Sequence, residues 1–244
     1  MTDADEWHAL AAFTPARVAL GRAGSALPTK RVLEFQLAHA RARDAVNAPF
    51  NATTLAKELG AIPLETRAAD RTAYLADPDL GRSLSDASHA KLTRGAYDAA
   101  LVVADGLSAI AIQAHGTALA RLIRAHLAEF KWAPVTIVTN GRVAIGDEIA
   151  LALGAALAVV LIGERPGLSA ADSVGVYLTY KPRPRFTKDA ERNCISNVRP
   201  GGLPLDEAAH RLAWLARQAL RIGVTGVSLK EDAPERLTGE GSAG

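Results

Sequence analysis

The chain has 244 residues, 49% of them hydrophobic, so it can bury the core of one large domain or of two unequal ones. Its formal net charge of +2 at pH 7 is too small to demand a nucleic acid or an anionic membrane as partner. The single cysteine, Cys194, excludes an intrachain disulfide and fits a reducing compartment.

The N-terminal sequence MTDADEWHALAAF does not resemble a secretory signal, because it starts acidic and its apolar stretch is short. The longest apolar run, residues 150–163, falls short of the roughly 20 residues that span a bilayer. Gly154 interrupts this run, which predicts a helix end, a turn and a buried strand. We therefore expect a soluble, cytoplasmic protein.

The first 80 residues predict helices. Between residues 32 and 46, apolar side chains recur at helical spacing, with arginines free to occupy the other side. Pro49, Pro63 and Pro78 then divide the chain into short pieces, none of which predicts a strand of convincing length. We expect residues 1–80 to form a small N-terminal helical domain.

From about Tyr97 onward, strands and helices alternate. Continuous apolar runs predict strands that are covered on both faces, at residues 99–104, 135–138, 156–162 and 174–180, with a possible short strand at 226–229. Helices are expected from the turn after residue 108 to about 130, at 143–153 and at 204–222. This alternation predicts an α/β fold with a doubly wound, Rossmann-like parallel sheet and flanking helices over residues 81–230. The polar tail, residues 231–244, is expected to be disordered.

Ligands of open parallel sheets bind at the carboxyl ends of the strands. Four segments follow those ends here: residues 105–108, 140–143, 163–169 and 181–200. In the first, we favour a turn with Ser108 as a helix cap over recognition of a ribose or phosphate, because no G-x-G-x-x-G follows the strand.

The second and third segments each carry one candidate contact residue. Val143 can offer its backbone or methyl groups to a ligand, although a valine at such a position is more often an ordinary packing residue. Glu164 directly follows a buried strand, and a buried carboxylate needs a partner. That partner is either an arginine, such as the adjacent Arg165, or an amide or hydroxyl group of a ligand, and the sequence leaves both open.

The fourth segment surrounds Cys194 with polar side chains. A lone cysteine is most often a small buried hydrophobe, and no cysteine or histidine lies nearby at the spacing of a zinc site or of a catalytic base. Asn193, Ser196, Asn197 and Arg199 supply hydrogen-bond donors and acceptors, which suit contact with a polar ligand better than bond-making.

Seven stretches, in chain order from about residue 15 to 230, resemble the small (light) subunit of ethanolamine ammonia-lyase. They are GRAG with a following PT, HARARDAV, YLADPDLGRSL, ADGLSA, GRVAIGDEI, VVLIGERPGLSAADSVGVYLTY and ERNCISNVRPGG. Single short matches would mean little, but seven ordered ones, with GERPGL and RNCISN among them, are highly specific.

The resemblance implies an adenosylcobalamin-dependent lyase that converts ethanolamine to acetaldehyde and ammonia as a hetero-oligomer. The large subunit of that family is a barrel that holds the substrate and performs the radical chemistry, while the small subunit closes over the cobalamin at the interface. The implied cofactor contacts fall on Val143, Glu164 and Cys194, each expected at or after the carboxyl end of a strand.

The resemblance implies no catalytic residue in this chain. It implies no cobalt ligand either, since no histidine stands in an Asp-x-His-x-x-Gly motif. It also implies packaging in a bacterial microcompartment, which in some members has been linked to a longer N-terminal extension.

Two alternatives come from other classes of protein. One is a stand-alone nucleotide-binding enzyme on a Rossmann-like sheet, against which the missing glycine fingerprint counts. The other is a nucleic-acid-binding module, suggested by the basic residues between positions 17 and 43, although helical arginines usually form a solvated face or an interface.

Overall fold

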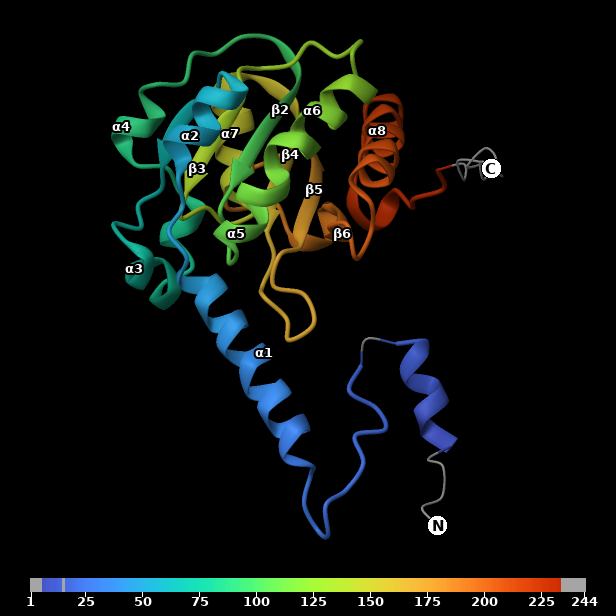
Figure 1. The fold of residues 1–244 in the computed structure, drawn as a ribbon. Helices are drawn as coiled ribbons and strands as arrows, with labels where there is room; N and C mark the ends of the chain where they lie inside the picture. Colours follow the sequence, from blue (N-terminus) through green and yellow to red (C-terminus); the bar gives the residue numbers. More distant parts are fainter. Residues whose placement is uncertain (1–5, 15, 234–244) are drawn as a thin grey trace.

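The computed structural model describes residues 6–14 and 16–233, and its centre is a six-stranded mixed sheet (Figure 1). The strand order is β1-β3-β2-β4-β5-β6. The strands are β1 (Ile62–Glu65), β2 (Tyr97–Ala104), β3 (Thr136–Thr139), β4 (Ala155–Gly163), β5 (Val174–Tyr180) and β6 (Asn193–Val198). Parallel pairing joins β1 to β3, β3 to β2 and β2 to β4, whereas β5 runs antiparallel to β4 and β6 antiparallel to β5.

Helices flank both faces of the sheet. The longer ones are α1 (Thr29–Asn47), α2 (Ala52–Leu59), α6 (Thr117–His126), α7 (Ile145–Leu153) and α8 (Leu205–Ile222). The short ones are α3 (Arg71–Ala76), α4 (Asp86–His89) and α5 (Ala109–Ala111), with a π-helical turn η3 (Ile112–Gly116) between α5 and α6. Single 3-10 segments are η1 (Glu6–Ala12), η2 (Leu80–Arg82), η4 (Asp189–Glu191) and η5 (Gly226–Ser228).

The central strand β2 alternates its fully buried side chains between two apolar clusters. Leu101 and Val103 join a cluster with α2, α6 and α8 on one face. Ala100 and Val102 join a smaller cluster with α7 on the other. Burial on both faces explains why β2 and β4 are continuous apolar runs.

The four main strands predicted from the apolar runs are confirmed as β2 to β5, but the expected all-parallel sheet is wrong for β5 and β6. The connection from β4 to β5, residues 164–173, contains no helix. A parallel return needs a crossover of a dozen or more residues, usually helical, so this connection can only bring the chain back antiparallel.

Two strands escaped prediction and one predicted strand is wrong. β1 contains Pro63, which an edge strand tolerates because its missing N–H can face away from the sheet. β6 is polar because Cys194 and its neighbours Ser196 and Asn197 are exposed. The segment expected as a strand at 226–229 is instead the 3-10 turn η5.

The predicted helices at 143–153 and 204–222 are confirmed as α7 and α8. Gly154 ends α7 in the left-handed conformation, with φ of 74°, and β4 starts at the next residue. The apolar run at 150–163 is thus a helix end, a turn and a strand. No helix within the described residues is both long and apolar enough to cross a membrane.

The N-terminal part of the chain divides in space. α1 projects from the body near the end of the sheet where α5 lies, whereas α2 packs on the sheet and β1 is one of its strands (Figure 1). The division into domains at residue 80 stays a prediction. Most of the tail expected to be disordered, from residue 234 on, lies outside the described residues.

A buried ion pair ties α7 to the start of β6. The Arg192 guanidinium donates to both carboxylate oxygens of Asp147, at 2.6 and 2.7 Å, and to Thr179 Oγ1 at 2.9 Å. The Arg192 and Asp147 side chains are 3% and 1% exposed. Removing one partner of such a pair leaves a buried charge uncompensated, which costs about 3–5 kcal/mol.

We therefore expect Asp147→Asn to lower the free energy of unfolding, measured by urea titration of the purified chain, by about 3 kcal/mol. The matched control is Asp189→Asn. Asp189 lies 3.7 Å from the same guanidinium, but its side chain is fully exposed, so its loss should change little. Equal effects of the two substitutions would contradict a structural role for the buried pair.

Candidate functional site

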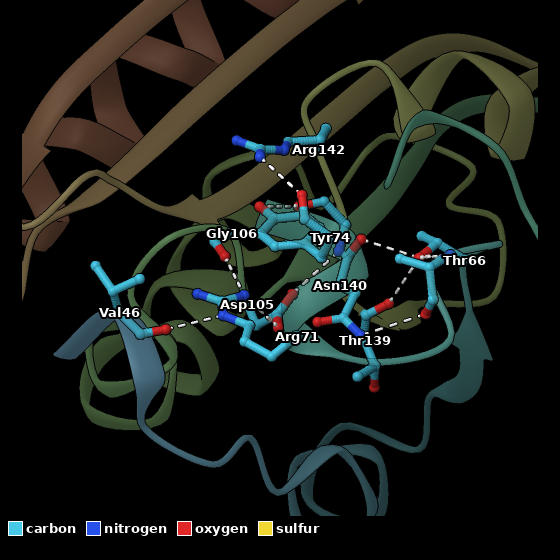
Figure 2. A network of polar contacts seen from close by, with 11 residues as sticks. Val46, Thr66, Arg71, Tyr74, Asp105, Gly106, Thr139, Asn140 and Arg142 are labelled. Atoms are coloured by element: carbon cyan, nitrogen blue, oxygen red, sulfur yellow. Dashed lines mark hydrogen bonds and ion pairs between the residues drawn. The ribbon is translucent and has the colours of Figure 1, made fainter. Parts of the chain in front are cut away.

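At the carboxyl ends of β2 and β3, the connections to the next helices leave toward opposite faces of the sheet. The chain after β2 leads to α5 and α6 on one face, and the chain after β3 leads to α7 on the other. Such a crevice is the usual ligand site of a doubly wound sheet. Here Arg71 and Tyr74 of α3 lie against these carboxyl ends (Figure 2).

Arg71 is the centre of this network. Its Nε donates to the Val46 carbonyl at 2.8 Å, and its Nη1 donates to the Gly106 carbonyl at 2.8 Å. The same Nη1 lies 3.3 Å from the Asp105 carboxylate. The bonds join the end of α1 to the loop after β2.

Tyr74 is fully buried beside the same loops, with the guanidinium carbons of Arg71 and Arg142 at 4.6 and 4.1 Å from its ring centroid. Burial raises the pKa of Tyr74 to about 12, so its hydroxyl stays protonated and donates to the Gly141 carbonyl at 3.1 Å. These side chains occupy the space where a nucleotide would enter, which counts against the nucleotide-binding alternative.

The interpretation of the first loop as a capped turn is confirmed, since Ser108 Oγ accepts a hydrogen bond from the Ala111 N–H at 3.2 Å. This loop also packs directly on the end of β4. Gly106 has a φ of 56°, and a side chain there would clash with the Gly163 carbonyl, which accepts from the Leu107 N–H at 2.9 Å. A side chain at Gly163 would in turn clash with the Ser108 carbonyl.

Glu164 follows β4 directly, as the sequence predicted, but its partner is neither an arginine nor a side chain. Its Oε2 accepts a hydrogen bond from the backbone N–H of Asn197 at 3.0 Å. Its own N–H donates to the Ser173 carbonyl at 3.0 Å. Arg165 is exposed beside it. The carboxylate is therefore held at the edge of the sheet, beside β5 and β6.

Cys194 lies within β6, paired with Tyr177 of β5, so its expected place in a loop at a carboxyl strand end is wrong. It is exposed, unlike the small buried residue that a lone cysteine usually is. Successive side chains of β6 point to opposite faces of the sheet, which explains both findings. Ile195 points into the core, and Cys194 points to the opposite side.

Tyr177 connects these residues. It packs against the α7-side cluster, lies directly opposite Cys194 in the β5–β6 pair and neighbours Gly175, whose missing side chain leaves room for its ring. A Cβ on Gly175 would lie 3.0 Å from Tyr177 Cε2 and 3.2 Å from Glu164 Oε1. We call the surface made by Glu164, Gly175, Tyr177 and Cys194 the open face.

The open face favours neutral hydroxyl and thiol groups. Burial raises the pKa of the Tyr177 hydroxyl, and its hydrogen bond with Cys194 and the negative charge of Glu164 add to the effect. Burial against the sheet also raises the pKa of the Cys194 thiol, and Glu164 adds to it. A protonated thiol is a poor nucleophile.

Val143, the third candidate contact residue, lies next to α7. It lies in the turn before that helix, half-buried, and packs against the same apolar cluster as Tyr177. The structure thus brings Glu164 and Cys194 together around Tyr177, and it places Val143 at the margin of the cluster on which Tyr177 rests.

The sequence analysis missed Gly175 and Tyr177, although the alternation in VGVYLTY places them on one side of a strand. One expected ligand contact is structural instead. Asn193 donates to the Leu229 carbonyl at 2.7 Å and accepts from the Gly226 N–H at 2.8 Å, which anchors η5. Within the described part of the chain, no group of three or more His, Cys, Asp or Glu side chains is arranged to hold a metal ion.

The family model described as ethanolamine ammonia-lyase light chain (EutC) matches residues 4–230. The chain belongs to this family. Proteins named ethanolamine ammonia-lyase small subunit include one from Xanthomonas campestris pv. campestris, which is 50% identical over 98% of this chain and 92% of its own length. Another, from Bradyrhizobium diazoefficiens, is 51% identical over 93% of this chain and 91% of its own length.

Membership of the ethanolamine ammonia-lyase light-chain family makes this chain a subunit of a lyase complex, and the name "small subunit" implies a large partner. The matched region includes both networks, the one around Arg71 and the open face.

Asp105 gives the Arg71 network a measurable pH dependence. Burial raises the pKa of Asp105 from 3.8 to about 6, although Arg71 and the N–H of Gly141 favour its charged form. The folded chain therefore holds a proton on Asp105 more tightly than the unfolded chain does. Because of this, ionisation of Asp105 should lower the free energy of unfolding progressively as the pH rises from about 4 to about 6.

The expected loss is about 2–3 kcal/mol, measured as the difference between the unfolding free energies of the wild type and of Asp105→Asn at successive pH values. Subtracting the two profiles removes the contribution of all other titrating groups. The control is Asp232→Asn, which changes an exposed carboxylate and should leave the profile parallel to that of the wild type. A wild-type minus Asp105→Asn difference that does not change with pH would contradict the buried, protonated Asp105.

Proposed function

We propose that this chain is the small subunit of an adenosylcobalamin-dependent ethanolamine ammonia-lyase, which converts ethanolamine to acetaldehyde and ammonia. In this proposal the chain helps to bind the cobalamin at the interface with the large, catalytic subunit, through Val143, Glu164 and Cys194. The large subunit holds the ethanolamine, and this chain supplies no catalytic residue. As in the family, the complex would be packaged in a bacterial microcompartment.

The observation that carries the proposal is the open face. α7 packs on β2 and β4, but β6 leaves Cys194 exposed on that side of the sheet. A surface with one carboxylate, one thiol and one phenol suits a broad ligand that carries amide donors around an apolar ring. A single sheet face cannot enclose such a ligand, so a second protein is needed to cover its other side.

The residues of the open face fit a corrin with amide side chains. Glu164 is oriented by the bond from the Asn197 N–H, and a carboxylate accepts strong hydrogen bonds from amide N–H groups. Its Oε1 lies beside Gly175 and the ring of Tyr177, and the Glu164 side chain is only partly buried. Cys194 and Val143 would provide close contact of low polarity.

The division of labour follows from the chemistry. The cofactor, when bound, supplies the radical chemistry, and the protein supplies binding, orientation and shielding. The part of this chain is to hold one side of the cofactor and exclude water from it. A neutral thiol on Cys194 serves contact without competing as a nucleophile.

Glu164→Ala should weaken cobalamin affinity in the assembled enzyme by about tenfold to a hundredfold, because it removes a charge-assisted hydrogen-bond acceptor. The affinity is measured by titrating the complex of both subunits with the corrinoid. Glu164→Gln, which keeps an acceptor oxygen, should lose less. If Glu164→Ala instead destabilises the free chain and leaves cobalamin affinity unchanged, the carboxylate serves only to hold Asn197.

Cys194→Ala should keep appreciable ethanolamine ammonia-lyase activity, because Cys194 is assigned contact and no bond-making. Cys194→Arg, which adds bulk and charge on the exposed side of β6, should weaken cobalamin binding in the assembled enzyme. Complete loss of activity in Cys194→Ala with normal cofactor binding would show that the thiol takes part in the chemistry.

A further inference from the structure

α1 is the least covered helix of its length in the described chain. Of its residues, Thr29–Asn47, only Ala45 is buried. Four large apolar side chains, Val32, Leu33, Phe35 and Leu37, are between 37% and 58% exposed. Leu27, just before the helix, is 51% exposed.

The apolar side chains of α1 do not share one side. At about 100° per residue, Phe35 and Leu37 point about 160° apart around the helix axis. A helix that is apolar on more than one side is normally enclosed. Most of the stability of a helix in a protein also comes from packing against other elements. Both facts indicate that α1 is covered in the working assembly.

The base of α1 is fixed to the carboxyl edge of the sheet. The carbonyl of Val46, in its last turn, accepts from Arg71, which also bonds Gly106 and Asp105 in the loop after β2 (Figure 2). The direction in which α1 leaves the body is therefore set by a part of the structure that is largely buried.

The chain that precedes α1 approaches the loop after β4. Arg17 donates to the Leu168 carbonyl at 3.4 Å, and its guanidinium carbon lies 5.6 Å from the centroid of the Phe35 ring. That loop begins with Glu164. α1 and the loop after β4 project from the same end of the sheet (Figure 1).

The charges of α1 restrict the partner. The helix carries the basic residues Lys30, Arg31, Arg41 and Arg43 against only Glu34 and Asp44. A surface that receives it needs an apolar floor for the leucines and an excess of acidic side chains at its rim.

From these observations we propose that α1 is a docking arm that inserts into an apolar, acid-rimmed groove of the large subunit. The inference rests on the proposed function for the identity of the partner. It adds which part of this chain holds the two subunits together, separately from the residues that touch the cofactor.

The test uses the double variant Leu33→Asp with Leu37→Asp, which places two charges one turn apart on the same side of the arm. Binding to the purified large subunit, measured by analytical ultracentrifugation, should weaken by at least about tenfold. The control is Val227→Asp in η5, another exposed apolar position, at 77%. It should leave the affinity unchanged. Thermal unfolding of each variant checks that the body stays folded, as expected because Leu33 and Leu37 are both exposed.

Undiminished binding of the double variant to the large subunit would overturn the proposal. So would loss of self-association of this chain with large-subunit binding intact, because α1 would then cover a second copy. Glu164→Ala separates this proposal from the cofactor proposal, since it should bind the large subunit normally and lose cobalamin affinity. If Glu164→Ala keeps full cobalamin affinity while the double variant fails to assemble, the docking arm stands and the cofactor contact does not.

Discussion

The helix-free, antiparallel connection from β4 to β5 determines which face of the sheet stays uncovered. Between β2 and β4 each return passes through a helix, and α6 and α7 cover opposite faces of the sheet. After β4 the returns contain no helix long enough to cover a strand, and the next long helix, α8, packs on the face that α6 already covers. The other face of β6 is left uncovered for that reason, and the exposed thiol of Cys194 follows from it.

Polar contacts fix the two margins of that bare surface. On one side, the ion pair of Asp147 with Arg192 holds α7 against the start of β6. At the carboxyl ends of β4 and β6, the Glu164 carboxylate accepts a hydrogen bond from the Asn197 N–H. This bond ties the ends of β4 and β6 together across β5. These contacts fix the strands and the helix around the surface in place, which suits a ligand that must be held in one orientation. Arg71 has a comparable structural role beside the carboxyl end of β2, where it joins α1, α3 and the loop after β2.

The hydrophobic pattern of the sequence predicts the strands that are covered on both faces, but it does not predict a strand with one exposed face. β2 and β4 were predictable because each is a continuous apolar run, and α7 because Gly154 marks its end. β6 was not, because a strand with one bare face is polar at alternate positions and NCISNV is too short to show a period. Glu164 was placed correctly at a strand end. Its bond to Asn197 and its proximity to Tyr177 depend on antiparallel register between distant segments, which no local pattern encodes.

The close contact of Gly106 with Gly163 couples the positions of the two loops. Neither position has space for a methyl group, because each faces a carbonyl oxygen of the opposite loop. A substitution at Gly106 would push the end of β4 outward and, with it, the next residue, Glu164. A side chain at either glycine would therefore move both loops, and with them the carboxylate that is proposed to contact the ligand.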